Sequence, residues 1–178
     1  ATAATDGLAH QVSLRNDTAT DHSGKTATFV GTDVDGFPLS ETIAMPGVSA
    51  TVETTGYFKT LTSVTPSATI GADTMDIGWV DEFISPTIGL DWRGGIVGLS
   101  VELTGTIDYT VQKTNNDIQV TDRTTIIWSA SNDTNVVAAT TRQDSNYIAL
   151  PIATRLVINS YSSGATIQYI IISGQYRK

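Results

Sequence analysis

The stretch VGLSVELTGTIDYTVQ, residues 97 to 112, contains the clearest structural signal in the sequence. Its apolar residues recur at every second position around Gly105: Val97, Leu99, Val101, Leu103, Ile107, Tyr109 and Val111. Because successive side chains of a strand point to opposite faces, this pattern predicts a strand with one buried face. The run is longer than the usual strand of about 5–6 residues. It therefore predicts either one long strand bent at Gly105 or two strands in succession.

The same period of two occurs on both sides of a turn signal in TATFVGTDVDGFPLSETIAM, residues 26 to 45. Here the pattern predicts a β-hairpin that turns through Asp33–Gly36, with Gly36 at a positive φ angle. The alternating carboxylates of Asp33 and Asp35 also resemble the start of a calcium-binding EF-hand loop. The later oxygen ligands and the flanking helices of such a loop are missing, so we expect no metal there.

Shorter segments continue the β pattern over the rest of the chain. We expect strands near HQVSLR (10–15), GYFKTLTSVT (56–65), TMDIGW (74–79), RTTIIWSA (123–130) and VVAAT (136–140). A closing hairpin is predicted, in which Leu156 and Ile158 lie on one strand and residues 165–171 on the other. The predicted fold class is all-β: two sandwich-like antiparallel modules, jelly-roll or Ig-like, with little or no helix.

Periodicity breaks in VDEFISPTIGLDWRGG, residues 80 to 95, where a proline, paired glycines and mixed charge occur. The predicted organisation is therefore an N-terminal β module at 1–80, a linker or crossover at 81–95 and a C-terminal β-sandwich at 96–178. A crossover within one larger β structure is the alternative.

Composition limits the classes of partner. The formal net charge of −8 and sequence pI of about 4.5 disfavour nucleic acid and anionic membranes, which are bound through clustered Lys and Arg. The absence of cysteine excludes disulfides, thiolate metal sites and thiol nucleophiles. No apolar run approaches the roughly 20 residues of a membrane-spanning helix, and the N-terminal ATAATDGLAHQ lacks the pattern of a secretory signal.

Candidate chemistry is sparse. Asp21, His22 and Ser23 are the residue types of a catalytic triad, but a triad is assembled from separated segments, so we interpret them as a solvated polar loop. The carboxylates of Asp73, Asp76, Asp81 and Glu82 lie close in sequence without a diagnostic spacing. Trp79 and Trp128 are predicted to be core residues rather than a sugar-binding platform. We expect no enzymatic activity, catalytic residue, cofactor or metal.

Four segments resemble those of a known family. They are HQVSLRNDTATDHSGKTATFVGTDVDGFPLSETIAMPG (10–47), FKTLTSVTPSATIGADTMDIGW (58–79), VGLSVELTGTIDYTVQKTNND (97–117) and ATRLVINSYSSGATIQYIII (153–172). These segments are similar to strand and hairpin patterns in virion structural proteins of tailed bacteriophages, of the capsid decoration or cement type. The resemblance covers nearly the whole chain. Its motifs are structural, and DIQVTDRTTIIW (117–128) stands where relatives often have a longer acidic and aromatic insert.

The resemblance implies a capsid decoration protein that is assembled in the host cytoplasm and lies on the outer capsid surface of the virion. Its implied partners are the major capsid protein and further copies of itself, with a trimer favoured over a dimer. A tail or head-to-tail connector protein and a head-fibre-like carbohydrate-binding protein are the alternatives.

Possible subunit-interface residues are Trp92, Ile170 and Ile172. Trp92 lies in the irregular segment between the predicted modules. The strand YIIIS (169–173) is apolar on both faces, so we expect it to be covered both by its own core and by a second surface.

Overall fold

A computed structural model describes residues 2–90, 96–147 and 150–174 of the chain. These residues form an all-β structure whose only helical elements are two 3-10 turns, at Arg123–Thr125 and Thr134–Val136. The predicted fold class is therefore confirmed. The chain divides into two compact units, Ala1–Ile84 (unit 1) and Ser85–Lys178 (unit 2).

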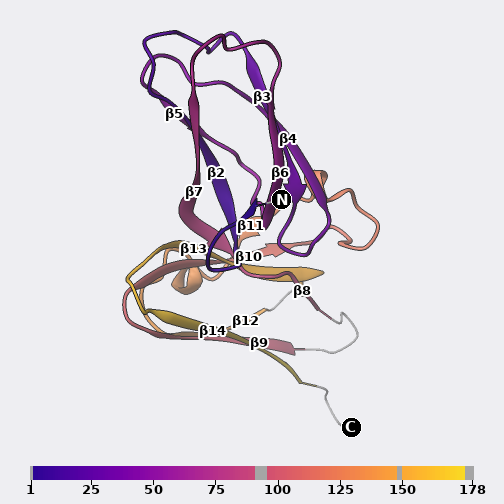
Figure 1. Cartoon of the computed structure of the whole chain (residues 1–178). Helices are drawn as coiled ribbons and strands as arrows, with labels where there is room; N and C mark the ends of the chain where they lie inside the picture. The colour runs from indigo at the N-terminus through magenta and orange to yellow at the C-terminus, as the bar shows by residue number, and fades with distance from the viewer. Residues whose placement is uncertain (1, 91–95, 148–149, 175–178) are drawn as a thin grey trace. The chain divides into compact units, whose positions relative to one another are not determined.

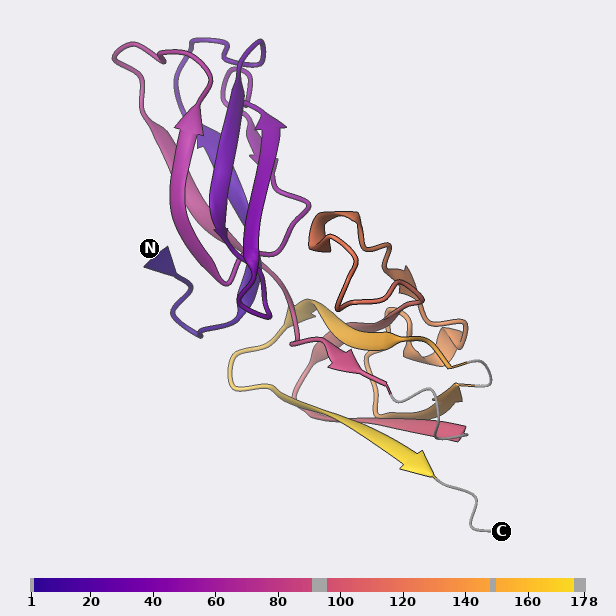
Figure 2. The same cartoon turned by 90° about the vertical axis from the view of Figure 1, so that its right-hand side faces the viewer.

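Unit 1 consists of antiparallel strands in two sheets (Figures 1 and 2). One sheet has the order β1-β6-β3-β4 and the other the order β7-β2-β5. The strands are β1 (Thr2–Ala3), β2 (Ala9–Asn16), β3 (Thr26–Thr32), β4 (Pro38–Ala44), β5 (Thr51–Glu53), β6 (Thr60–Pro66) and β7 (Met75–Ile84).

The core of unit 1 lies between these two sheets. Val12 and Leu14 of β2 pack in one buried cluster with Ala27 and Phe29 of β3. The rings of Phe29 and Phe58 lie 6.4 Å apart, and both side chains are fully buried. Alternating side chains of both sheets thus fill one interior, which is the arrangement of a β-sandwich.

The predicted hairpin is present as β3 and β4, which pair from Thr26↔Ala44 to Thr32↔Pro38. In its turn the backbone N–H of Asp33 donates to the carbonyl of Phe37 at 2.8 Å, and Gly36 has a φ of +87°. One carboxylate oxygen of Asp33 accepts from the backbone N–H groups of Asp35 and Phe37. Asp33 therefore stabilises the turn through its side chain.

Replacing Gly36 with valine is expected to lower the free energy of unfolding by roughly 1–2 kcal/mol, because a β-branched residue is strained at positive φ. No atom lies within 4 Å of the added Cβ, so the loss would come from the backbone rather than from a clash. Urea unfolding measures this loss in the free energy of unfolding. Gly24→Val is the control, since Gly24 is also surrounded by open space and is not at positive φ. Equal effects of the two substitutions would contradict the backbone explanation.

Unit 2 also consists of antiparallel strands in two sheets. One sheet has the order β11-β10-β13, with β8 pairing with β13, and the other has the order β12-β9-β14. The strands are β8 (Ile88–Gly89), β9 (Ile96–Thr104), β10 (Ile107–Thr114), β11 (Ser129–Ala130), β12 (Gln143–Tyr147), β13 (Ala153–Tyr161) and β14 (Thr166–Gly174).

The stretch 97–112 forms two strands that belong to different sheets of unit 2. Gly105, at a φ of +79°, lies between them, and a Cβ there would approach the Cβ of Ala165 to 3.0 Å. The alternating apolar residues are buried on both sides of this corner, at Val97, Leu99, Val101, Ile107, Tyr109 and Val111. Of the two expected arrangements, the structure has two strands in succession rather than one long bent strand, and the chain changes sheet at Gly105.

The predicted closing hairpin is wrong. β13 pairs with β10 and β14 pairs with β9, so the turn at Ser162–Ala165 leads from one sheet to the other. This turn lies beside the corner at Gly105, since the N–H of Ser162 donates to the carbonyl of Thr106 at 2.8 Å. β9 continues into β10 at Gly105, and β13 continues into β14 at Ser162–Ala165. The two paired strands therefore pass from one sheet to the other side by side. Ser162, Ser163 and Gly164 are the residue types that a hairpin would also use, which is why the sequence did not separate the two possibilities.

Two short predicted strands are also replaced by other structure. Of the expected strand at 123–130 only Ser129–Ala130 forms one, and Arg123–Thr125 is a 3-10 turn. In place of a strand at 136–140, the 3-10 turn Thr134–Val136 is followed by a single bridge from Ala139 to Tyr109. Ala138 between them has a φ of +48°, which a regular strand does not allow.

Residues 81–90 are more regular than the expected linker. β7 continues to Ile84, and β8 at Ile88–Gly89 pairs with β13 inside unit 2. The compact units divide between Ile84 and Ser85, within the predicted 81–95 segment.

Candidate functional site

Two of the three predicted interface residues lie on β14, and Trp92 lies outside the described residues. Ile170 is half-buried, whereas Ile172 keeps 60% of its surface exposed. Both pair with β9, Ile170 opposite Ser100 and Ile172 opposite Gly98. Because Gly98 has no side chain, nothing on that neighbouring position covers Ile172.

β14 ends the sheet β12-β9-β14 among the described residues (Figures 1 and 2). One side of the strand pairs with β9 along its whole length, from Thr166↔Thr104 to Gly174↔Ile96. In an antiparallel ladder alternate residues direct their N–H and C=O groups to the other side. The edge of β14 that faces away from β9 therefore presents a row of backbone donors and acceptors. The side chains along this strand are largely apolar.

A buried group of three hydroxyls holds β14 in place. The hydroxyl of Thr154 on β13 lies 2.7 Å from that of Tyr169 on β14 and 2.9 Å from that of Tyr147 on β12. It also donates to the carbonyl of Gln112 at 2.8 Å. Burial raises the pKa of both Tyr147 and Tyr169. These bonds join the two sheets of unit 2 and place Tyr169 on the core face, so Ile170 and Ile172 lie on the opposite face.

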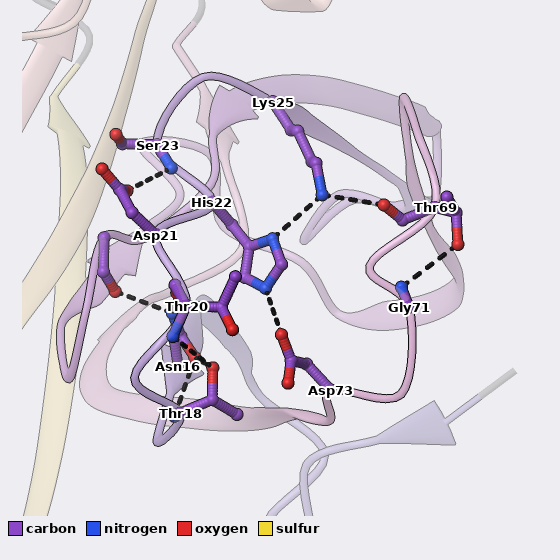
Figure 3. Close-up of polar contacts among 11 residues, drawn as sticks. Asn16, Thr18, Thr20, Asp21, His22, Ser23, Lys25, Thr69, Gly71 and Asp73 are labelled. Carbon is purple, nitrogen blue, oxygen red and sulfur yellow. Dashed lines mark hydrogen bonds and ion pairs between the residues drawn. The ribbon is translucent and has the colours of Figure 1, made fainter.

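The loop around His22, predicted to be solvated, is held by several polar contacts (Figure 3), and the His22 side chain itself is buried. Its Nε2 lies 2.9 Å from a carboxylate oxygen of Asp73, and its Nδ1 lies 3.0 Å from Nζ of Lys25. Lys25 also donates to the carbonyl of Thr69 at 2.7 Å. Asp21 accepts instead from the backbone N–H of Ser23. The three residues that resembled a triad are therefore not arranged as one, and His22 links its loop to the 67–74 loop.

The partners of His22 define its tautomer. The ammonium of Lys25 can only donate and the carboxylate of Asp73 accepts, so Nδ1 is the acceptor and Nε2–H the donor of a neutral ring. The hydrogen bond from His22 is the largest cause that lowers the pKa of Asp73. Both ring nitrogens are used, and the ring is inaccessible to solvent, so this cluster is suited to fixing two loops.

Replacing Asp73 with asparagine is expected to lower the melting temperature at pH 7. The pKa of Asp73 is lower in the folded state than the ordinary value of 3.8, so its contribution is complete above that value and is lost as the pH falls through the folded pKa. Melting curves of both proteins from neutral to acidic pH test this. The difference between them should shrink below about pH 3.8. A difference that stays constant would show that the charge of Asp73 does not contribute.

The ring of His10, unlike that of His22, has a hydrogen-bond acceptor at each of its two nitrogens. Its Nδ1 lies 2.7 Å from the carbonyl of Val80 and its Nε2 lies 2.9 Å from a carboxylate oxygen of Asp6. Both partners are acceptors, so the ring makes both bonds only as the imidazolium. Burial would raise the pKa of Asp6, but the bonds from Leu8 N–H and His10 outweigh it and lower that pKa. The pair fixes the start of β2 against β7.

The four carboxylates near β7 are not brought together as a site. Asp73 bonds to His22, and Glu82 accepts from the hydroxyl of Tyr57. Asp76 and Glu82 lie on one extended strand, about 20 Å apart at the usual rise per residue, which is too far for a glycosidase pair. Among residues 2–90, 96–147 and 150–174, no group of three or more His, Asp or Glu side chains is placed to hold a metal ion.

Adding calcium is expected to leave the melting temperature unchanged. The Asp33 carboxylate already accepts two backbone hydrogen bonds in its turn, and the loop provides few further oxygen ligands. Thermal melts with and without calcium are the measurement. An increase in melting temperature that disappears when Asp33 and Asp35 are both changed to asparagine would instead establish a calcium site.

The tryptophans are less buried than predicted. Trp79 packs half-buried against the core of unit 1, and Ile77, expected on the same buried face, is 50% exposed. Trp128 is also half-buried, and the guanidinium of Arg155 lies 4.2 Å from the centre of its ring. This cation–π contact holds Trp128 against β13.

The sequence matches no protein-family model, and neither a curated protein nor a solved structure matches it. The described part of the chain also contains no helix of the length and apolarity needed to cross a bilayer.

Proposed function

We propose that this chain is a non-enzymatic structural protein of a tailed bacteriophage virion, and specifically a decoration or cement protein that binds the major capsid protein on the outer shell. The observation that carries the proposal is the near full-length resemblance described above. The segments that resemble such proteins are the framework strands of the two units: β2, β3, β4, β6 and β7 in unit 1, and β9, β10, β13 and β14 in unit 2.

The side chains available for chemistry also support a structural role. His10, His22 and Asp73 are used in hydrogen bonds that join loops and strands. The three buried hydroxyls around Thr154 likewise join two sheets. Such use of polar groups favours a rigid folded unit over a reactive site.

A decoration protein binds a shell that repeats the same contact many times. Each contact can be weak, because linked copies bind a repeating surface with an effective concentration far above that in free solution. The acidic chain, with its formal net charge of −8, is suited to an outer surface rather than to contact with packaged DNA.

The test is to delete the gene from the phage that encodes the chain and then add the purified protein back to the particles. We expect heads without the added density that break more readily under heat or low salt. Purified protein should bind these heads saturably and restore their resistance. Heads that already contain the protein are the matched control and should bind no more.

Other outcomes would contradict the decoration role. Fully decorated heads with defective or missing tails would indicate a connector or tail protein. Normal particles that fail only to adsorb to the host would indicate a carbohydrate-binding, fibre-like protein.

A further inference from the structure

We propose that the edge of β14 that pairs with no other described strand pairs with β14 of a second copy of this chain, as antiparallel strands related by a two-fold axis. The pairing would extend the sheet β12-β9-β14 of each copy into one continuous sheet across the dimer. It is independent of the virion role, so either can fail alone.

The first argument is that β14 lacks the features that protect sheet edges. Natural edges are kept from pairing by short strands, prolines and charges. Among the described strands, others at sheet ends have such features: β1, β5 and β11 contain two or three residues, β4 begins with Pro38 and includes Glu41, and β12 contains Asp144. β14 has nine residues, TIQYIIISG, with neither proline nor charge.

The second argument concerns which strand fits the edge. The backbone groups on that edge require another extended strand, and the apolar side chains require one that is apolar on both faces. β14 meets both requirements itself, because Tyr169 and Ile171 alternate with Ile170 and Ile172. When two copies pair antiparallel, each face of one strand continues the same kind of face on the other.

The third argument is electrostatic. Each copy has a formal net charge of −8, so the repulsion between two copies is smallest when their contact lies in an uncharged region. The sequence contains no Asp, Glu, Lys or Arg from Leu156 to Tyr176, which includes all of β14. This region is therefore suited to contact between like-charged copies.

The strand is also fixed before a partner binds. Its pairing with all nine residues of β9 and the bond from Tyr169 to Thr154 hold it in an extended form. Association then needs little further ordering of the backbone, which favours binding.

Sedimentation velocity of the full chain over about two decades of concentration tests the proposal. We expect a monomer–dimer equilibrium that becomes at least about tenfold weaker in Ile172→Lys, because lysine on an edge strand is a natural block to pairing. The matched control is Val120→Lys, which places the same charge at an apolar residue that is 82% exposed on another part of unit 2. The control should associate like the unchanged protein.

Hydrogen exchange distinguishes pairing through the backbone from other contacts. In the dimer the outward N–H groups of β14 should exchange more slowly than in Ile172→Lys, whereas those bonded to β9 should be slow in both. A monomer at all concentrations, a dimer that Ile172→Lys leaves intact, equal weakening by Val120→Lys, or a three-copy assembly would each overturn the two-fold pairing.

Discussion

Replacing Gly31 with alanine is expected to destabilise unit 1, with a loss of roughly 3 kcal/mol or more in the free energy of unfolding. A Cβ at Gly31 would lie 1.9 Å from the backbone carbonyl oxygen of Thr60 and 3.1 Å from the ring of Phe58. Two non-bonded atoms cannot approach to 1.9 Å, so one of the strands must move.

Neither strand can move easily. Gly31 lies in β3, which is paired on one side with β4 and on the other with β6. The pairing with β6 shifts by one residue between Val30 and Gly31, which is the irregularity of a β-bulge at the point of contact. Phe58, the other neighbour, is fully buried in the core of unit 1. A methyl group here therefore disturbs both the sheet and the core.

Urea unfolding of the full chain, with hydrogen exchange to locate the loss, is the measurement. Protection should fall across β3 and β6. Gly98→Ala is the control because Gly98 also lies in a strand, yet its added Cβ would meet only backbone oxygens at 3.9 Å. If Gly31→Ala were as stable as Gly98→Ala, the close approach of β3 and β6 would be wrong.

Replacing Thr154 with valine is expected to lower the free energy of unfolding by about 3 kcal/mol or more, although the two side chains have nearly the same shape. The Thr154 hydroxyl donates one hydrogen bond to Gln112 and can accept two from Tyr147 and Tyr169, which uses its full capacity. Valine would leave the two tyrosine hydroxyls only the hydrogen bond to each other, so they could not both donate, and a buried donor without a partner costs about 1–3 kcal/mol.

Thr154→Ser is the matched variant, since it keeps the hydroxyl and removes only a methyl group. Denaturant unfolding of both proteins should show the serine variant to be clearly the more stable. Tyr169→Phe in each background measures the coupling, and its effect should be smaller when Thr154 is already valine. Equal stability of the valine and serine variants would mean that the three hydroxyls contribute little.

Local patterns predicted the strands well. The alternation from Val97 to Val111 indicated β9 and β10, and the turn at Asp33–Gly36 was recognised with its glycine at positive φ. Each of these signals depends on neighbouring residues alone. The same reasoning failed where a predicted strand had only a few apolar residues, as in the segment before Trp128. That segment forms a 3-10 turn and a loop.

Pairing between distant segments could not be predicted. Whether Ser162–Ala165 turns within a sheet or between sheets depends on β9 and β10, some 50 residues earlier in the chain. The burial of His22 depends on Asp73, which is 51 residues away. The need for glycine at position 31 could not be predicted from the sequence, because it arises from the irregular pairing of β3 with β6.

The residues predicted to lie at a subunit interface show what the sequence could and could not predict. Apolar residues on both faces of YIIIS predict a second surface against β14; Ile172 is exposed in the single chain, and the second surface stays a prediction. That β14 ends its sheet follows only from the strand order.

Cryo-electron microscopy of the intact particle of the phage that encodes this chain tests the proposed function most directly. The account predicts repeated density on the outer face of the shell, into which the two β-sandwich units fit, in contact with the major capsid protein. Density for the chain only in the tail or at the head-to-tail junction, or its absence from the particle, would contradict the decoration role.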